Sequence, residues 1–504
     1  MAGAKQGARD GTAGRGNEPT GTDGGESERP IVPRRPGNRS HRDPVEGRGR
    51  RDEEPTGGKM PERFSSGSVS TRLCRIAEVA RKTPAMVITT LAHHIDTVWM
   101  YEAYRQTRKS GAVGVDKVSA EEYAADLESN LSSLLDRFKS GTYFAPPVRR
   151  VEIPKGDGKQ TRPIGVPTFE DKVLQRTVAM ALEAVYEQDF EECSYGFRPG
   201  RSAHDAVEAL WKGLMEMRGG WVVDLDISKF VDSLDHRKLR EILDTRVRDG
   251  VIRKTIDKWL KAGVMTEGIL ERPASGTPQG GVISPILSNV YLHEVLDSWF
   301  EKRVKPRLRG RAFMVRYADD AVLVFSDRKE AERVLKALTE RCLSYGLRLH
   351  PEKTRLVPFR RPPRPPGGGG PGSGQGTGTF DFLGFTHFWA KSRRGKWHVG
   401  RKTARGRLRR AIKAVNWWCA SHRHWRVRVQ HRYLSKVIVG HCRYYGITGN
   451  SIQIGRFRQE VERAWREWLN RRSQRAKMTW ARFRKLSKRY PLPPAIAYHS
   501  VCRA

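Results

Sequence analysis

Two adjacent aspartates are the residues of this sequence best suited to carry out chemistry. Asp319 and Asp320 end the sequence YADD, between the apolar runs FMVRY (313–317) and AVLVF (321–325). This pattern predicts two strands joined by a tight hairpin, with both carboxylates at its tip. Adjacent carboxylates repel each other unless a cation lies between them, and oxygen ligands suit Mg²⁺. Taken alone, the pair also fits an ordinary solvated turn.

A third carboxylate follows another apolar run. WVVDLDI (221–227) is typical of a strand in which Asp224 and Asp226 project to one face and the intervening apolar residues to the other. Such a strand could bring a carboxylate beside the hairpin. Two Mg²⁺ ions about 4 Å apart, held by these groups, would activate a primer 3′-hydroxyl and stabilise the leaving pyrophosphate. Asp224 also fits a purely structural role.

Two turns carry groups that suit a nucleotide. GTPQGG (276–281) precedes a long amphipathic pattern, and its glycines would let the backbone approach a nucleotide while Gln279 forms hydrogen bonds. PKGDGKQTRPI (154–164) resembles a hairpin turn whose cations could clamp a triphosphate. An ordinary helix start and solvated lysines are the plainer interpretations of these turns.

The elements that must position these residues differ along the chain. From 66 to 390, short β-branched runs alternate with helical patterns, which predicts an α+β fold. From 391 to 504, apolar residues recur at helical spacing among 31 Lys and Arg and three acidic residues, hence a charge of +28. This predicts a separate basic helical domain. We expect a disordered basic tail at 1–65 and a flexible Gly/Pro insertion at 361–379.

Composition narrows the class of partner. The chain has 94 Lys and Arg against 56 Asp and Glu, and a net charge of +38 attracts polyanions. Charge alone does not distinguish an enzyme from a general nucleic-acid binder. The six scattered cysteines lack zinc-site spacing, and neither an export signal nor a run of membrane-spanning length occurs. We therefore expect a cytoplasmic protein with no membrane partner.

Taken together and in order, these segments resemble the reverse transcriptases encoded by bacterial group II introns. The resemblance covers roughly residues 66–504, and its most selective parts are SYGFRPGRSAHDAV (194–207) and FLGF (382–385). The other matching segments are VGVDKVSAEEY (113–123), IPKGDGKQTRPIGVPTFEDKVLQ (153–175), VVDLDISKFVDSLDH (222–236), GTPQGGVISPILSNVYLHEVLD (276–297), RYADDAVLVF (316–325) and LHPEKT (349–354).

The resemblance implies an RNA-directed DNA polymerase with the right-hand fold of fingers, palm and thumb. It implies that Asp226, Asp319 and Asp320 are catalytic and hold Mg²⁺ together with the backbone carbonyl of Ile227. The positions that match the family's contacts to the incoming dNTP are Lys155, Arg162, Ile227, Val231, Gln279 and Lys353. The implied partners are group II intron RNA, a primer or target DNA, and dNTPs.

The C-terminal segment resembles the family's thumb and maturase domain, which grips the intron RNA and promotes its splicing. The resemblance centres on HRYLSKVIVGHCRYYGITGN (431–450). Expected RNA contacts are Arg409, Arg410, Arg432, Lys436, Arg443 and Tyr444. Interleaved aromatic residues can stack on unpaired bases, although Trp417, Trp465 and Trp468 also fit a core between helices.

Three features depart from the family pattern. No Cys/His-rich endonuclease segment is recognisable, so an endonuclease-lacking form that primes from an existing 3′ end is expected. Lys117 stands where the resemblance predicts glycine. Val231 stands where the family usually has an aromatic ring beneath the deoxyribose, and strand alternation predicts that the neighbouring Phe230 points to the other side. Weaker exclusion of ribonucleotides follows from this difference.

Two other functions fit part of the sequence. A reverse transcriptase of a retron, diversity-generating or phage-defence system would share the polymerase motifs, but the basic segment 431–450 argues against it. A splicing cofactor with a vestigial polymerase site would share the basic domain, but the three aspartates and Gln279 argue against it.

Overall fold

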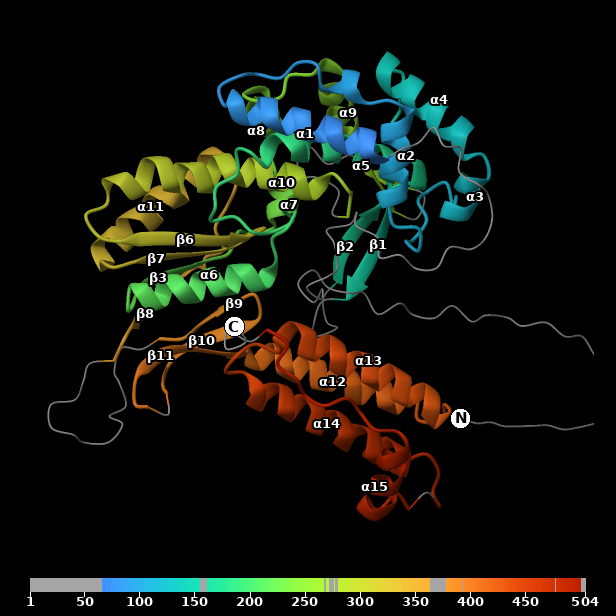
Figure 1. Cartoon of the computed structure of the whole chain (residues 1–504), viewed down its shortest axis with the longest axis vertical. Coiled ribbons are helices and arrows are strands. Elements are labelled where there is room, and N and C mark those ends of the chain that lie inside the picture. The colour runs from blue at the N-terminus through green and yellow to red at the C-terminus, as the bar shows by residue number, and fades with distance from the viewer. Residues whose placement is uncertain are drawn as a thin grey trace, which may run out of the picture. The chain divides into compact units, whose positions relative to one another are not determined.

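The computed structural model describes residues 66–154, 161–266, 269–271, 276, 280–362, 378–392, 394–475 and 477–499. The expectations for the tail (1–65), Lys155, Gln279 and most of the Gly/Pro insertion lie outside these residues. Helices and strands are both present, as an α+β fold requires (Figure 1). Within the described part of the chain, no helix is long and apolar enough to cross a membrane.

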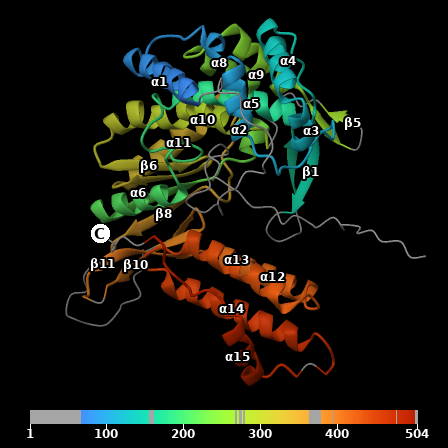
Figure 2. The ribbon, with the colours of Figure 1, turned by 45° about the vertical axis from the view of Figure 1, so that its right-hand side comes forward.

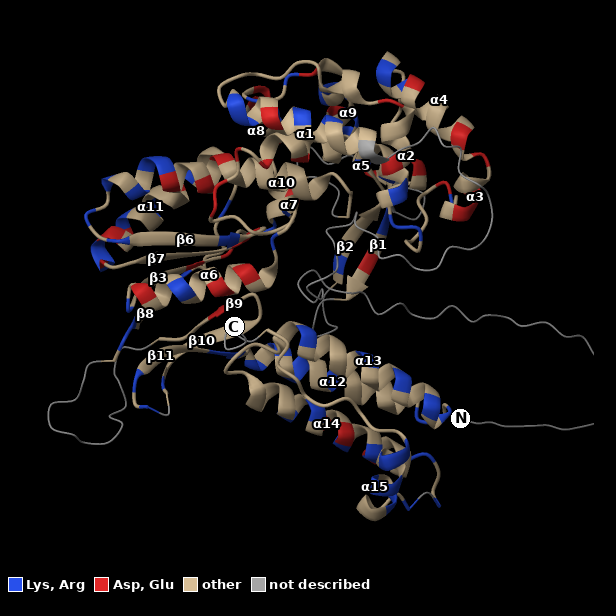
Figure 3. Ribbon diagram, in the orientation of Figure 1, with Lys and Arg blue, Asp and Glu red and all other residues tan. Residues whose placement is uncertain are grey.

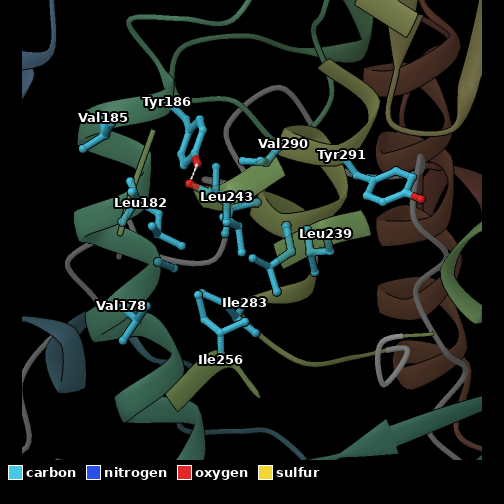
Figure 4. Close-up of a cluster of buried hydrophobic side chains, with 14 of the residues drawn as sticks. Val178, Leu182, Val185, Tyr186, Leu239, Leu243, Ile256, Ile283, Val290 and Tyr291 are labelled. Carbon is cyan, nitrogen blue, oxygen red and sulfur yellow. Dashed lines mark hydrogen bonds between the residues drawn. The ribbon is translucent and has the colours of Figure 1, made fainter. Parts of the chain in front are cut away.

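The first half of the chain is mostly helical. Its helices pack around α5 (Phe169–Tyr186), whose side chains are largely buried. Figure 4 shows Leu182 and Tyr186 of this helix packed with Leu243, whose carbonyl accepts a hydrogen bond from the Tyr186 hydroxyl at 3.5 Å. The other helices here are α1 (Ser66–Lys82), α2 (Thr97–Gln106), α3 (Ala120–Ala125), α4 (Leu127–Ser140), α8 (His236–Asp244) and α9 (Gly250–Lys261), with a 3₁₀ turn at Leu91–His94. A small sheet has the order β2-β1-β4-β5, with β1 (Val148–Pro154), β2 (Thr161–Val166), β4 (Val264–Thr266) and β5 (Ile269–Glu271).

A second, antiparallel sheet has the order β6-β7-β3-β8. Its strands are β3 (Gly219–Leu225), β6 (Ala312–Tyr317), β7 (Asp320–Phe325) and β8 (Arg355–Arg360). Alternate residues enter two different cores: Val223 and Leu225 belong to one, and Val222 belongs to the other. Both faces are therefore covered, by α10 and α11 on one side and α6 on the other (Figures 1 and 2).

The helices that cover this sheet are α6 (Ala203–Glu216), α10 (Ser284–Leu292) and α11 (Arg328–Ser344). The helix α10 continues through π-helical turns at His293–Ser298 and Phe300–Val304 and a 3₁₀ turn at Lys305–Arg307. A single helical turn, α7 (Phe230–Ser233), follows β3.

The C-terminal third begins with a three-stranded sheet of order β11-β10-β9, formed by β9 (Phe380–Phe382), β10 (Phe385–Lys391) and β11 (Trp397–Thr403). Four helices follow: α12 (Arg405–Ser421), α13 (Val427–Tyr445), α14 (Ser451–Asn470) and α15 (Trp480–Arg489). They share a core with α6, and the His204 ring nitrogen Nε2 lies 2.8 Å from the Tyr444 carbonyl oxygen.

Candidate active site and nucleic-acid interface

The predicted hairpin and the predicted strand come together as neighbours in the sheet. β6 and β7 pair through Tyr317 and Asp320, and Leu225 of β3 pairs with Ala321 of β7. One step further along this antiparallel register, Asp226 lies beside Asp320. The sequence 221–227 and the hairpin therefore place three carboxylates at one end of the sheet.

The surroundings of the hairpin make its carboxylates harder to ionise. The side chains of Asp319 and Asp320 are exposed at the tip of the hairpin, although the protein around them limits the hydration of their charged forms. This loss raises the pKa of Asp319, and it raises the pKa of Asp320 to about 7, a shift to which the charges of Asp319 and Asp226 also contribute. A bound cation would relieve this repulsion.

Asp224 of β3 and Asp226, which follows the end of this strand, have different partners. Asp226 faces Lys353, whose Nζ lies 3.2 Å from Oδ2, whereas Asp224 forms an ion pair of 2.9 Å with Arg355. Burial raises the pKa of Asp224, and Arg355 opposes that shift. Asp224 thus has a cation of its own, which agrees with the structural role that the sequence left open for it.

The segment that contains Lys353 also fixes the backbone after β3. The Asp226 carbonyl accepts from the His350 amide at 2.8 Å, and the Ser228 amide donates to the Arg348 carbonyl at 2.8 Å. Ile227, between them, forms an antiparallel bridge with Leu349 without sharing these bonds. By antiparallel geometry, its carbonyl therefore faces away from this segment.

Two arginines from distant elements approach the carboxylates. Arg162 of β2 is close enough to Asp319 to oppose the rise of its pKa, and Arg407 of α12 does the same for Asp320. Arg162 was expected here from the sequence. Arg407 was not, because it is one of six cations between residues 401 and 410 and nothing in their spacing distinguishes it.

The donor set suits a divalent ion, although the side chains do not form a closed metal site by themselves. Within the described residues, no group of three His, Cys, Asp or Glu side chains is arranged to hold a metal ion. Carboxylate and carbonyl oxygens are nevertheless the ligands of hard cations, which commonly take further ligands from substrate phosphates. The residues present therefore fit a divalent ion that takes its remaining ligands from other molecules.

The structure corrects the reasoning about Phe230 and Val231. β3 ends at Leu225, and Lys229 adopts a left-handed backbone with φ of 46° before the turn of α7. Strand alternation therefore does not apply to Phe230. Its ring is buried, with its centroid 6.4 Å from that of Tyr291, so it still cannot replace an aromatic residue at position 231. Val231 is partly buried against the same core.

Comparisons with known proteins agree with this geometry. The family model described as reverse transcriptase (RNA-dependent DNA polymerase) matches residues 153–387, which contain all three carboxylates. Protein YkfC of Escherichia coli (strain K12) is 35% identical over 319 residues, which cover 56% of this chain and 83% of YkfC. The group II intron-encoded protein LtrA of Lactococcus lactis subsp. cremoris is 40% identical over 168 residues.

The chain belongs to the group II intron-encoded reverse transcriptases. It is thus an RNA-dependent DNA polymerase, and enzymes of this kind use divalent metal ions. The match to LtrA spans 33% of this reverse transcriptase and 28% of LtrA. Nuclear intron maturase 2 of Arabidopsis thaliana, a mitochondrial protein, is 30% identical over 220 residues, 34% of this chain and 30% of the maturase.

The C-terminal helices of the reverse transcriptase carry a concentrated positive charge (Figure 3). α12 and α13 contain no acidic residue. Arg432, Lys436 and Arg443 are exposed on α13 at spacings of four and seven, so they form one stripe, and Arg409 is exposed on α12. Arg410 is only partly exposed.

Tyr444 differs from the expectation that it contacts RNA. Its side chain is 3% exposed, its hydroxyl donates to the Leu383 carbonyl at 2.9 Å, and its ring stacks on Phe385. The reason is that helical periodicity turns position 444 away from the stripe and into the core. Tyr444 therefore joins α13 to the FLGF segment.

The tryptophans divide between core and surface. Trp465 is fully buried, as the interpretation of a helical core predicted, and Trp468 is partly buried. That interpretation is wrong for Trp417, which is 61% exposed on α12.

Lys117, where the resemblance predicted glycine, has a left-handed backbone with φ of 60°. Glycine adopts this conformation without strain, so the backbone here keeps the shape that a glycine would favour.

Proposed function

We propose that this reverse transcriptase extends a DNA primer on its intron RNA by using Asp226, Asp319 and Asp320 around Mg²⁺. The convergence of these carboxylates at the end of β3 and the β6–β7 hairpin is the observation that carries the proposal. Bound Mg²⁺ would activate the primer 3′-hydroxyl and stabilise the leaving pyrophosphate. The dNTP would lie between the hairpin and Arg162, with Lys353 and Val231 beside it. Lys155 and Gln279 remain proposed nucleotide contacts.

The right-hand subdivision follows from this placement. The sheet with β3, β6 and β7 would be the palm, and the helices before it with the β1–β2 hairpin would be the fingers, together residues 66–390. Residues 391–504 would form the thumb and the maturase domain. The cationic stripe of α13 and the exposed Arg409 would hold phosphates of the intron RNA and so help it to fold and splice.

The experiment measures both activities of the chain. Primer extension is followed on an RNA template with dNTPs and Mg²⁺, and splicing is followed with the intron RNA transcribed from the sequence that flanks the coding region. We expect extension that depends on a divalent ion, and faster splicing at low Mg²⁺ when the protein is added. Splicing without extension would instead support a cofactor with a vestigial polymerase site.

A further inference from the structure

A buried arginine lies directly before the proposed catalytic hairpin. Arg316 is 0% exposed on β6, and its guanidinium uses all five of its N–H groups. Nε and Nη2 donate to the two carboxylate oxygens of Asp297 at 2.7 and 2.5 Å. Nη2 also donates to Ser194 Oγ at 2.7 Å, and Nη1 donates to Asn289 Oδ1 at 3.1 Å and to the Ala318 carbonyl at 2.9 Å.

The last of these bonds reaches the turn itself. Ala318 precedes Asp319 and has a φ of 56°, which residues other than glycine rarely adopt. Such a backbone persists when its surroundings fix it. A buried guanidinium that is neutralised by Asp297 and holds the Ala318 carbonyl supplies a rigid constraint of this kind.

The segment 194–197, the SYGF part of the most selective sequence motif, holds the same turn from another direction. The Tyr195 amide donates a hydrogen bond of 2.8 Å to the Arg316 carbonyl. The Arg316 amide in turn donates one of 2.8 Å to the carbonyl of Cys193, just before this segment. Asn289 Nδ2 donates to the Gly196 carbonyl at 2.7 Å. A Cβ atom on Gly196 would lie 2.3 Å from the Ala318 amide nitrogen, so only glycine allows this approach.

We propose that Arg316 is a positioning residue, which with Asp297, Asn289, Ser194 and Gly196 holds the Ala318 turn so that Asp319 and Asp320 can share a metal ion. The proposal rests on the catalytic role proposed above for these two aspartates. It also gives a function to the SYGF motif, whose residues would touch neither nucleotide nor metal. Their effect would be transmitted through the backbone of the turn.

The first test is Arg316→Lys, which keeps the charge but cannot provide the planar set of five donors. We expect the extension rate to fall about 100-fold, as for a small misplacement of catalytic groups. The Mg²⁺ concentration for half-maximal rate should rise about 10-fold, as when an outer partner of a metal ligand is lost. RNA binding should remain at the level of the parent.

The matched control is Arg246→Lys in the helical first half of the chain. Arg246 is also a buried arginine: it pairs with Asp189 at 2.8 Å and donates to the carbonyls of Ala80, Thr83 and Met86. It should lose a similar amount of thermal stability without any change in Mg²⁺ dependence. An equal shift in Mg²⁺ dependence for both variants would overturn the proposal, because it would reflect general destabilisation.

A second variant approaches the turn from the other side, in case Arg316→Lys does not fold. Gly196→Ala should displace the Ala318 amide and likewise raise the half-saturating Mg²⁺ concentration, whereas Gly250→Ala, where a Cβ meets no atom within 4 Å, should not. If folded Gly196→Ala or Arg316→Lys extended the primer at the rate of the parent and with the same Mg²⁺ dependence, the positioning role would be refuted. Full activity of Asp319→Asn would refute the proposed function instead, so the two failures are distinguishable.

Discussion

Lys353 Nζ lies within 3.4 Å of both carboxylate oxygens of Asp226, at 3.2 Å from Oδ2. The lysine side chain is 60% exposed, so this pair contributes little to stability. Its ammonium group is instead free to leave Asp226 for another anion. A triphosphate that arrives with its own metal ion would provide that anion.

We predict that Lys353→Gln raises the KM for dNTP about 10-fold, because one cation near the triphosphate is lost. Binding of Mg²⁺ to the protein without dNTP should become tighter, because Lys353 no longer competes for Asp226. Steady-state kinetics and calorimetry measure the two effects. Arg355→Gln, which removes the partner of Asp224 instead, should change neither, and equal effects in both variants would contradict the distinct roles of the two pairs.

The raised pKa of Asp320 predicts a pH dependence of stability in the absence of metal. An unfolded aspartate ionises near pH 4, whereas the pKa of Asp320 in the folded protein is about 7. Between these values the folded state holds the additional proton, so the free energy of unfolding should fall as the pH rises from about 4 to 7. Asp320→Asn should reduce this fall in denaturation experiments with EDTA, and an unchanged pH profile would contradict the assignment.

The same proton should compete with the metal ion. Ligand carboxylates bind metal only after deprotonation, so the apparent affinity for Mg²⁺ should decrease about 10-fold for each pH unit below 7. Titration calorimetry at pH 5.5, 6.5 and 7.5 measures this dependence. Constant affinity across the three buffers would show that Asp320 is already ionised in the metal-free protein.

The sequence predicted the local elements of the site better than their surroundings. Apolar runs with short turns were sufficient to locate the hairpin strands, and strand periodicity placed Asp224 and Asp226 on one face. The turn after β3 was not predictable, because its left-handed residue is Lys229 and not the glycine that usually marks such a backbone conformation. The approach of Arg407 to the hairpin depends on where α12 lies in the tertiary fold, which periodicity within one helix does not specify. The burial of Tyr444, by contrast, follows from the periodicity of α13, which turns this position away from the cationic stripe.

For Arg316, the sequence did indicate that a buried ion pair should be present. A cation near the end of the apolar strand 312–317 needs a buried anionic partner, and this could have been inferred from the sequence alone. The partner itself, Asp297, could not have been identified, because it lies on a helix that reaches the strand only through the tertiary fold.

The stripe on α13 predicts a salt-dependent RNA affinity. Replacing Arg432, Lys436 and Arg443 together by glutamine should weaken intron RNA binding and reduce the slope of log affinity against log salt by about 2. Filter binding at several salt concentrations measures both. The control replaces Lys212 and Arg237, two surface cations paired with glutamates, and should leave the slope unchanged. Identical slopes for the stripe variant and the parent would show that α13 is not part of the RNA-binding surface.

Val231 predicts the sugar selectivity of the polymerase. A small side chain leaves room for a 2′-hydroxyl, and such a mismatch in a pocket changes selectivity by roughly 10- to 200-fold. We expect the parent to exclude rNTPs less well than its relatives do, and Val231→Phe to exclude them more strongly. Competition between dNTP and rNTP in single-nucleotide extension measures the ratio. An unchanged ratio in Val231→Phe would show that other side chains line the sugar site.

The central claim, that the hairpin carboxylates and Asp226 perform the polymerase reaction, is tested most directly by comparing Asp320→Asn with Asp224→Asn. Both changes replace one carboxylate by an amide on the paired strands β3 and β7, where Asp224 lies opposite Val322, two residues along the strand from Asp320. The measurement is the single-turnover rate of primer extension on RNA at saturating dNTP and Mg²⁺, with RNA binding as the check on folding. We predict no detectable extension for Asp320→Asn and a rate near that of the parent for Asp224→Asn. Equal rates for the parent and Asp320→Asn would contradict the account.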